Sequence, residues 1–146
     1  MIQVTKIFYF EMAHALAGYE GACKNIHGHS YELHVTVLKA IDDQHYLPPP
    51  GFIIDFKEIK KLVNEYVIKE LDHKLLLSKG YLGKQSHLST LANLVIWEAE
   101  PTAENILIFI RLVLEKHFSA SIQLARLKLF ETKDSYAEWL NTNVHR

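Results

Sequence analysis

Apolar and polar residues alternate over two stretches near the start of the chain. Residues 2–12 alternate loosely and are rich in Ile, Val, Thr, Phe and Tyr, whereas residues 29–40 alternate well, with Tyr31, Leu33 and Val35 on one side. A period of two residues is typical of a strand that has one covered face. The two stretches therefore predict strands that can pair as a long antiparallel ribbon.

Two helices are predicted by apolar stripes with a period near four residues. The first runs from Phe56 to about 71–73, behind a Pro- and Gly-rich turn, and Asp55 with Glu58 resembles a capping box at its start. The second begins at Thr102, where Glu104 in the first turn complements the positive end of the helix.

The rest of the chain supplies further strands and one segment without a clear period. Residues 122–131 and 136–140 have the composition of strands, while residues 74–100 read as a variable region in which 88–98 fits either a short strand or a helix. The order of elements indicates an α+β fold with a helical layer on an antiparallel sheet. A length of 146 residues favours a single domain, residues 1–146.

Composition narrows the class of protein. Hydrophobic residues make up 49% and charged residues 23%, and the formal net charge is -1, so no broad basic surface for nucleic acid or anionic lipid is expected. The single cysteine excludes an internal disulfide and suits a reducing compartment. No signal-peptide pattern or apolar stretch of membrane-spanning length is evident, and together these features predict a cytoplasmic protein.

Histidine is the most unusual feature of the composition, and its spacing suggests a metal site. His27 and His29 lie on the same side of an extended strand, roughly 6.6 Å apart. His14, at the end of the preceding strand, would lie beside them if the two strands pair, and three imidazoles fit Zn²⁺ with a fourth position left open. His34 has the opposite parity, which makes it a poor ligand; by motif alone, ordinary surface or packing histidines remain the alternative.

Other candidate residues each allow more than one interpretation. Cys23, four residues before His27, could be a catalytic thiolate, a fourth zinc ligand, or a small buried side chain. Asp72 and His73 could form an acid–base pair or a helix C-terminal cap. Glu131 could anchor a ligand that carries N–H donors, or it could be an exposed loop carboxylate.

Six blocks in the same order resemble the 6-pyruvoyl-tetrahydropterin synthase and 6-carboxytetrahydropterin synthase family, and they cover nearly the whole chain. The blocks are Phe10–His14, Cys23–Tyr31, Gly51–Phe56, Leu71–His73, Pro101–Asn105 and Glu131–Thr132. The resemblance implies the tunnelling fold, a four-stranded antiparallel sheet with two helices on one face. It also implies homo-oligomers, usually hexamers built from two trimers, in which the sheets join into a barrel.

The resemblance also implies roles for individual residues. The implied zinc ligands are His14, His27 and His29; the implied catalytic residues are Cys23, Asp72 and His73; the implied substrate-binding residues are Glu131, Thr102 and Glu104. Helix capping explains Glu104 equally well. Two departures from the family pattern are the long 74–100 segment and Ala103, which replaces a hydroxyl residue of some relatives.

The implied reaction uses 7,8-dihydroneopterin triphosphate as substrate and Zn²⁺ as cofactor, without an external redox cofactor. The spacing of Cys23, His27 and His29 matches the queuosine-pathway enzymes, so we expect 6-carboxytetrahydropterin, acetaldehyde and triphosphate as products. The alternatives are the pyruvoyl-forming reaction, cleavage of the side chain to a folate precursor, and a zinc- or pterin-binding protein without turnover.

Overall fold

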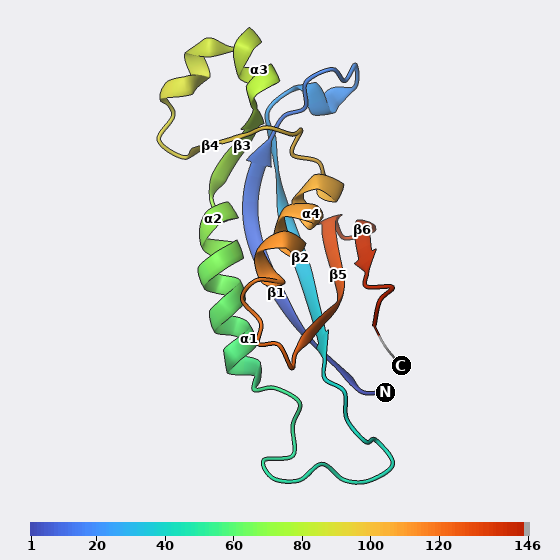
Figure 1. Cartoon of the computed structure of the whole chain (residues 1–146). Helices are drawn as coiled ribbons and strands as arrows, with labels where there is room; N and C mark the ends of the chain where they lie inside the picture. Colours follow the sequence, from blue (N-terminus) through green and yellow to red (C-terminus); the bar gives the residue numbers. More distant parts are fainter. Residues whose placement is uncertain (145–146) are drawn as a thin grey trace.

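The computed structural model describes residues 1–144, which fold around one curved sheet (Figure 1). Six strands form this sheet: β1 (Gln3–His14), β2 (His27–Leu38), β3 (Lys74–Ser78), β4 (Leu94–Trp97), β5 (Gln123–Thr132) and β6 (Ser135–Leu140). Their spatial order is β4-β3-β1-β2-β5-β6. Strands β1, β2, β5 and β6 pair antiparallel, whereas β3 and β4 are parallel to β1 and to each other.

The expected four-stranded antiparallel sheet is therefore wrong in its strand number, because the 74–100 segment adds two parallel strands. β3 is short and is buried on both faces from Leu75 to Ser78, so its sequence shows no alternation. β4 has only four residues. The structure thus resolves the alternative left open for 88–98 in favour of a strand, after the short helical turn η3 (Ser86–Thr90).

The predicted helices are present and begin where their caps were expected. The first consists of α1 (Phe56–Val63), a π-helical turn η2 (Asn64–Ile68) and α2 (Lys69–Leu71), and the Asp55 carboxylate accepts a hydrogen bond from the Lys57 N–H. The second is α4 (Ala103–Leu114), capped by Thr102. Two shorter helical elements are η1 (Ala22–Lys24) and α3 (Lys79–Lys84).

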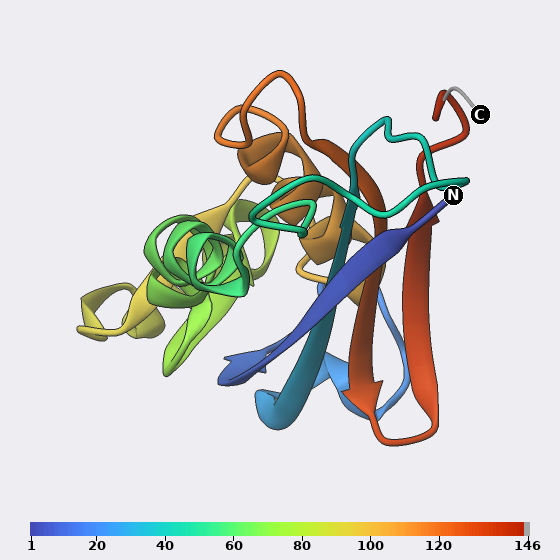
Figure 2. The same cartoon turned by 90° about the horizontal axis from the view of Figure 1, so that it is seen from below.

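Both long helices pack on the same face of the sheet, as Figure 2 shows from below. The core combines alternate residues of β1 and β2 with the apolar stripes of the helices; fully buried examples are Leu33, Val35, Ile59, Val63, Ile106 and Ile110. Within residues 1–144, no helix covers the opposite face of the sheet, where Ile7 and Tyr9 of β1 are exposed. None of the helices within residues 1–144 has the length and apolar character needed to cross a membrane.

Candidate metal centre and substrate pocket

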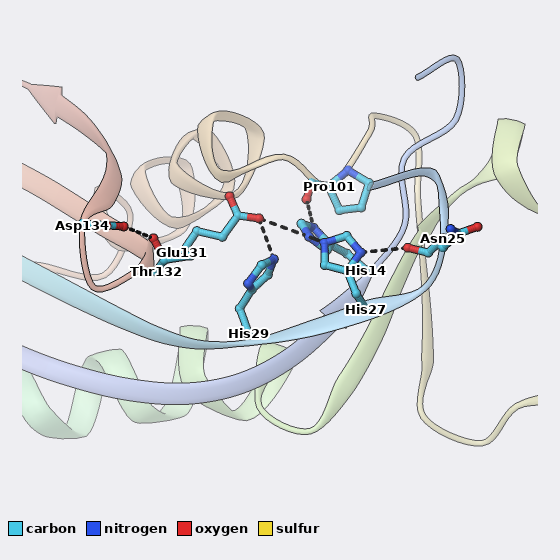
Figure 3. Close-up of polar contacts among 8 residues, drawn as sticks. All are labelled: His14, Asn25, His27, His29, Pro101, Glu131, Thr132 and Asp134. Carbon is cyan, nitrogen blue, oxygen red and sulfur yellow. Dashed lines mark hydrogen bonds and ion pairs between the residues drawn. The ribbon is translucent and has the colours of Figure 1, made fainter. Parts of the chain in front are cut away.

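Three histidines meet at one end of the β1–β2 ribbon (Figure 3). β1 ends at His14 and β2 begins at His27, and the antiparallel register places these two residues opposite each other. His29 follows on the same side of β2, and Glu131 reaches the cluster from β5. One ligand atom from each of the four residues lies within 4.8 Å of the other three.

Backbone carbonyls hold two of the imidazole rings from behind. Nδ1 of His14 lies 2.7 Å from the carbonyl oxygen of Pro101, and Nδ1 of His27 lies 2.7 Å from that of Asn25. Because a carbonyl can only accept, each Nδ1 must carry the proton and donate it. The two Nε2 atoms, 3.0 Å apart, are left with lone pairs that face each other, and this arrangement suits a cation.

The third imidazole also fits a metal ion. Nε2 of His29 is buried and lacks a well-aligned hydrogen bond, although the Glu131 carboxylate is 2.8 Å away. Burial lowers the pKa of His29, and His14 and His27 act in the same direction while Glu131 opposes them. The lowered pKa favours the neutral form of the ring, which is the form that binds a metal. A donor set of three nitrogens and one carboxylate matches the ligands that zinc and related divalent ions prefer.

Glu131 is the fourth donor of this cluster, a role that the sequence did not predict. Its Oε1 lies 2.8 Å from Nε2 of His29 and 3.3 Å from Nε2 of His14. The nearby imidazoles of His14, His29 and His27 lower the pKa of Glu131 from its usual value, although burial acts in the opposite direction. The alternation along β5 could have indicated this position. Leu127 and Leu129 are fully buried, and Glu131, two residues further on, points to the same side of the strand.

Glu131 also borders a hollow of about 180 Å³ beside the cluster, together with Glu104 of α4. Ala103, Ser135, Tyr136 and Ala137 complete its lining. The structure thus brings together two of the three residues expected to bind substrate. Thr102 lies at the start of the same helix, where its hydroxyl accepts a hydrogen bond from the Asn105 N–H.

Cys23 lies near the cluster in sequence but is not one of its four donors. It occupies the turn η1, is partly buried, and its carbonyl accepts a hydrogen bond from the Leu16 N–H at 2.9 Å. Among residues 1–144, the grouped donor atoms come from histidines and Glu131 alone. This grouping favours a thiol outside the donor set over the alternative of a fourth zinc ligand.

Asp72 and His73 form a pair, but within one chain they lie away from the histidines. Oδ2 of Asp72 is 2.9 Å from Nδ1 of His73, and Oδ1 accepts from the Glu11 N–H. Although burial raises it, the pKa of Asp72 lies below its usual value because the hydrogen bonds from Glu11 and His73 prevail. Neither Asp72 nor His73 belongs to the group of four donors, and the His73 side chain is 78% exposed.

The comparison with protein families agrees with this architecture. The family model described as 6-pyruvoyl tetrahydropterin synthase matches residues 3–141. The chain belongs to the 6-pyruvoyl tetrahydropterin synthase family. The match spans all six strands and both long helices, so it includes every residue of the cluster and of the hollow.

Individual relatives of this family place the chain among enzymes. A 6-carboxy-5,6,7,8-tetrahydropterin synthase of Rickettsia bellii is 30% identical over 142 residues, covering 94% of this chain and 99% of the relative. The enzyme of the same name from Haemophilus influenzae is 30% identical over 146 residues, covering 95% and 99%. The 6-pyruvoyl tetrahydropterin synthase structure from Caenorhabditis elegans superposes with a TM-score of 0.67 at 20% identity, covering 97% and 96%, and supports the fold.

Proposed function

We propose that this enzyme converts 7,8-dihydroneopterin triphosphate to 6-carboxy-5,6,7,8-tetrahydropterin, with release of acetaldehyde and triphosphate. The observation that carries the proposal is the convergence of three imidazole Nε2 atoms beside a hollow bordered by Glu131 and Glu104. A metal-binding histidine cluster next to the carboxylates of Glu131 and Glu104 suits a small ligand that presents both hydroxyls and ring N–H groups. The names of the full-length relatives support the carboxy-forming reaction over the pyruvoyl-forming one.

His14, His27 and His29 would hold Zn²⁺, which supplies Lewis-acid chemistry to oxygens of the substrate side chain. The Cys23 thiolate takes the proton from the carbon next to these oxygens, a role supported by its place in the β1–β2 connection, whose two ends carry His14 and His27. Glu131 and Glu104 accept hydrogen bonds from the amino and ring N–H groups of the pterin. The pterin orientation therefore follows from the two carboxylates.

The Asp72–His73 pair is proposed to transfer a second proton, and its position suggests that it acts in the site of a neighbouring copy. On β1, β3 pairs only with Met12, Ala13 and His14, so the outer edge of β1 from Gln3 to Phe10 has no strand partner within the described chain. The outer edge of β6 is unpaired as well. The free edges of β1 and β6, together with an uncovered sheet face, support closure of several sheets into a barrel, in trimers that stack as hexamers.

Mass analysis of the products from zinc-loaded protein and 7,8-dihydroneopterin triphosphate tests the proposal. We expect the carboxy product together with acetaldehyde. A pyruvoyl product would retain the proton-transfer chemistry and assign the enzyme to the other branch of the family. No product from zinc-loaded, fully assembled protein would contradict the proposed reaction and favour a pterin-binding role.

A further inference from the structure

A second hollow, of about 370 Å³, shares no lining residue with the hollow bordered by Glu131 and Glu104. Its walls come from the β1–β2 connection, residues 16–20 with Lys24 and Asn25, and from α3 and the residue after it, through Tyr81, Lys84 and Gln85. Figure 1 shows α3 and this connection at the same end of the sheet. The volume is within the range of small-ligand sites.

The polar side chains of this hollow suit an anion that carries several charges. Lys24 and Lys84 are exposed on its two walls, and neither forms an ion pair within residues 1–144. Tyr19 and Tyr81 add phenolic groups, and Asn25 and Gln85 add amides that can donate. Glu20 is the single acidic side chain of the lining, so the lining has an excess of one positive charge.

The β1–β2 connection that forms one wall also contains residues of the proposed active site or lies directly beside them. It begins directly after His14 and contains Cys23, and the carbonyl of Asn25 holds the His27 ring. The Ala17 N–H donates to the Glu100 carboxylate, next to Pro101, whose carbonyl holds His14. The metal cluster and this hollow therefore share one short connection, which begins after His14 and ends before His27.

The other wall is fixed to the first by packing. Tyr81, Leu82 and Leu88 pack against a small apolar cluster that contains Ala15, the first residue of the connection. The hydroxyl of Ser78 caps α3 by accepting from the Tyr81 N–H. Lys84 is thereby held on a folded element across the hollow from the connection that carries Lys24, so the 74–100 segment contributes one of its walls.

We propose that this hollow binds the phosphate chain of the pterin substrate, with Lys24 and Lys84 contacting it from opposite walls. The proposal rests on the proposed function, because it assumes that the substrate carries a polyphosphate. Ammonium groups on two sides of a phosphate chain neutralise more of its charge than one group does. The 74–100 segment would accordingly be a substrate-binding element.

Calorimetric titration of the zinc-loaded full-length protein with inorganic tripolyphosphate tests the site without turnover. Lys24→Gln and Lys84→Gln should each weaken binding about three- to tenfold, since each removes one partly exposed charge contact. Glu20→Gln should strengthen binding, because it removes the opposing charge. Lys79→Gln is the matched control: Lys79 is on the same helix but pairs with Glu98 outside the hollow, and this variant should bind as the wild type does.

Steady-state kinetics with 7,8-dihydroneopterin triphosphate separate a substrate subsite from an unrelated anion site. The two lysine variants should raise KM by a similar factor with little change in kcat, and tripolyphosphate should compete with the substrate. Turnover with unchanged KM in both variants would overturn the phosphate role and leave the proposed reaction intact.

Two binding results distinguish the remaining cases. Tripolyphosphate affinity that is equal in all variants and disappears when zinc is removed would mean chelation by the metal, which overturns the proposal. Lysine-dependent binding in a protein that shows no turnover would support the polyphosphate site and contradict the proposed reaction.

Discussion

At the residue scale, the cluster depends on which nitrogen of each imidazole carries no proton and can bind a metal. The carbonyls of Pro101 and Asn25 fix Nδ1–H on His14 and His27, so both rings present Nε2 to the same point. His34, also on β2, lies on the opposite side and pairs with Glu32 at 2.6 Å. β2 therefore offers both a histidine inside the cluster, His27, and one outside it, His34, so the two can be compared by mutation.

His27→Ala should lose zinc and activity together, with a fall in metal affinity of more than about 100-fold, since it removes a direct donor. His34→Ala is the matched control and should retain one zinc per chain, because its ring does not contact the cluster. Metal content after dialysis, measured by plasma emission, checks both variants. Stoichiometric zinc in His27→Ala would refute the three-histidine site.

Cys23→Ala should keep zinc and the fold but lose turnover, because the thiol is outside the group of donors. Metal content, circular dichroism and product formation measured on the same sample check this expectation. Loss of zinc from this variant would instead show that the thiol is a ligand.

Zinc retention should fall toward acidic pH, because a proton on Nε2 competes directly with the ion. The pKa of His29 lies below the usual value of an imidazole because the ring is buried, so its protonation begins at a lower pH than that of an exposed histidine. We expect full occupancy at about pH 7.5 and substantial loss near about pH 5. Retention that did not depend on pH would argue against imidazole ligands.

At the scale of elements, the burial of side chains along α4 predicts which substitutions lower the free energy of unfolding and which leave it unchanged. Ile110 is fully buried in the core, whereas Ile108 on the same helix is 48% exposed. Ile110→Ala should lower the free energy of unfolding by about 2–5 kcal/mol through lost burial and a cavity. Ile108→Ala should change it by about 0.5 kcal/mol or less. Urea denaturation of the two variants measures the difference, and equal losses would contradict the assigned helix face.

Periodicity predicted the elements that have one covered face and failed for those that do not. β1, β2 and both long helices alternate or form stripes, and all were located within a few residues. β3 is buried on both faces and consists largely of Leu, which carries no two-residue period and little strand preference. The parallel pairing of β3 and β4 therefore required the structure.

The candidate site was predictable where its residues are close along the strand ribbon. The pairing of β1 with β2 brought His14 to His27, as the sequence analysis expected. The contact of Glu131 with these histidines depends on the packing of β5, and no local pattern encodes its distance. The separation of Asp72 and His73 from the cluster likewise depends on where β3 joins β1.

At the scale of the whole molecule, the uncovered face of the sheet is the surface expected to meet other copies. Tyr9 is 68% exposed at its centre, among neighbouring side chains such as Glu11, His34 and Lys128. Tyr9→Lys should reduce the assembly toward the single-chain mass of 16.9 kDa, because burying an unpaired ammonium group is costly.

Light scattering coupled to size exclusion measures that mass. Tyr46→Lys serves as the control, since Tyr46 is fully exposed in the loop after β2 and should leave the assembly unchanged. A wild-type protein that elutes as a single chain would contradict the proposed assembly.

The metal cluster also has a consequence for heat resistance. The three proposed zinc ligands come from β1 and β2, so a bound ion would join the ends of these two strands in a chain whose single cysteine forms no internal disulfide. Unfolding must then release the ion, and mass action makes Tm rise with the concentration of free metal. At a free concentration of 100 times Kd the gain is about 2.7 kcal/mol. The melting temperature of this protein would thus serve as a gauge of how much metal its surroundings supply.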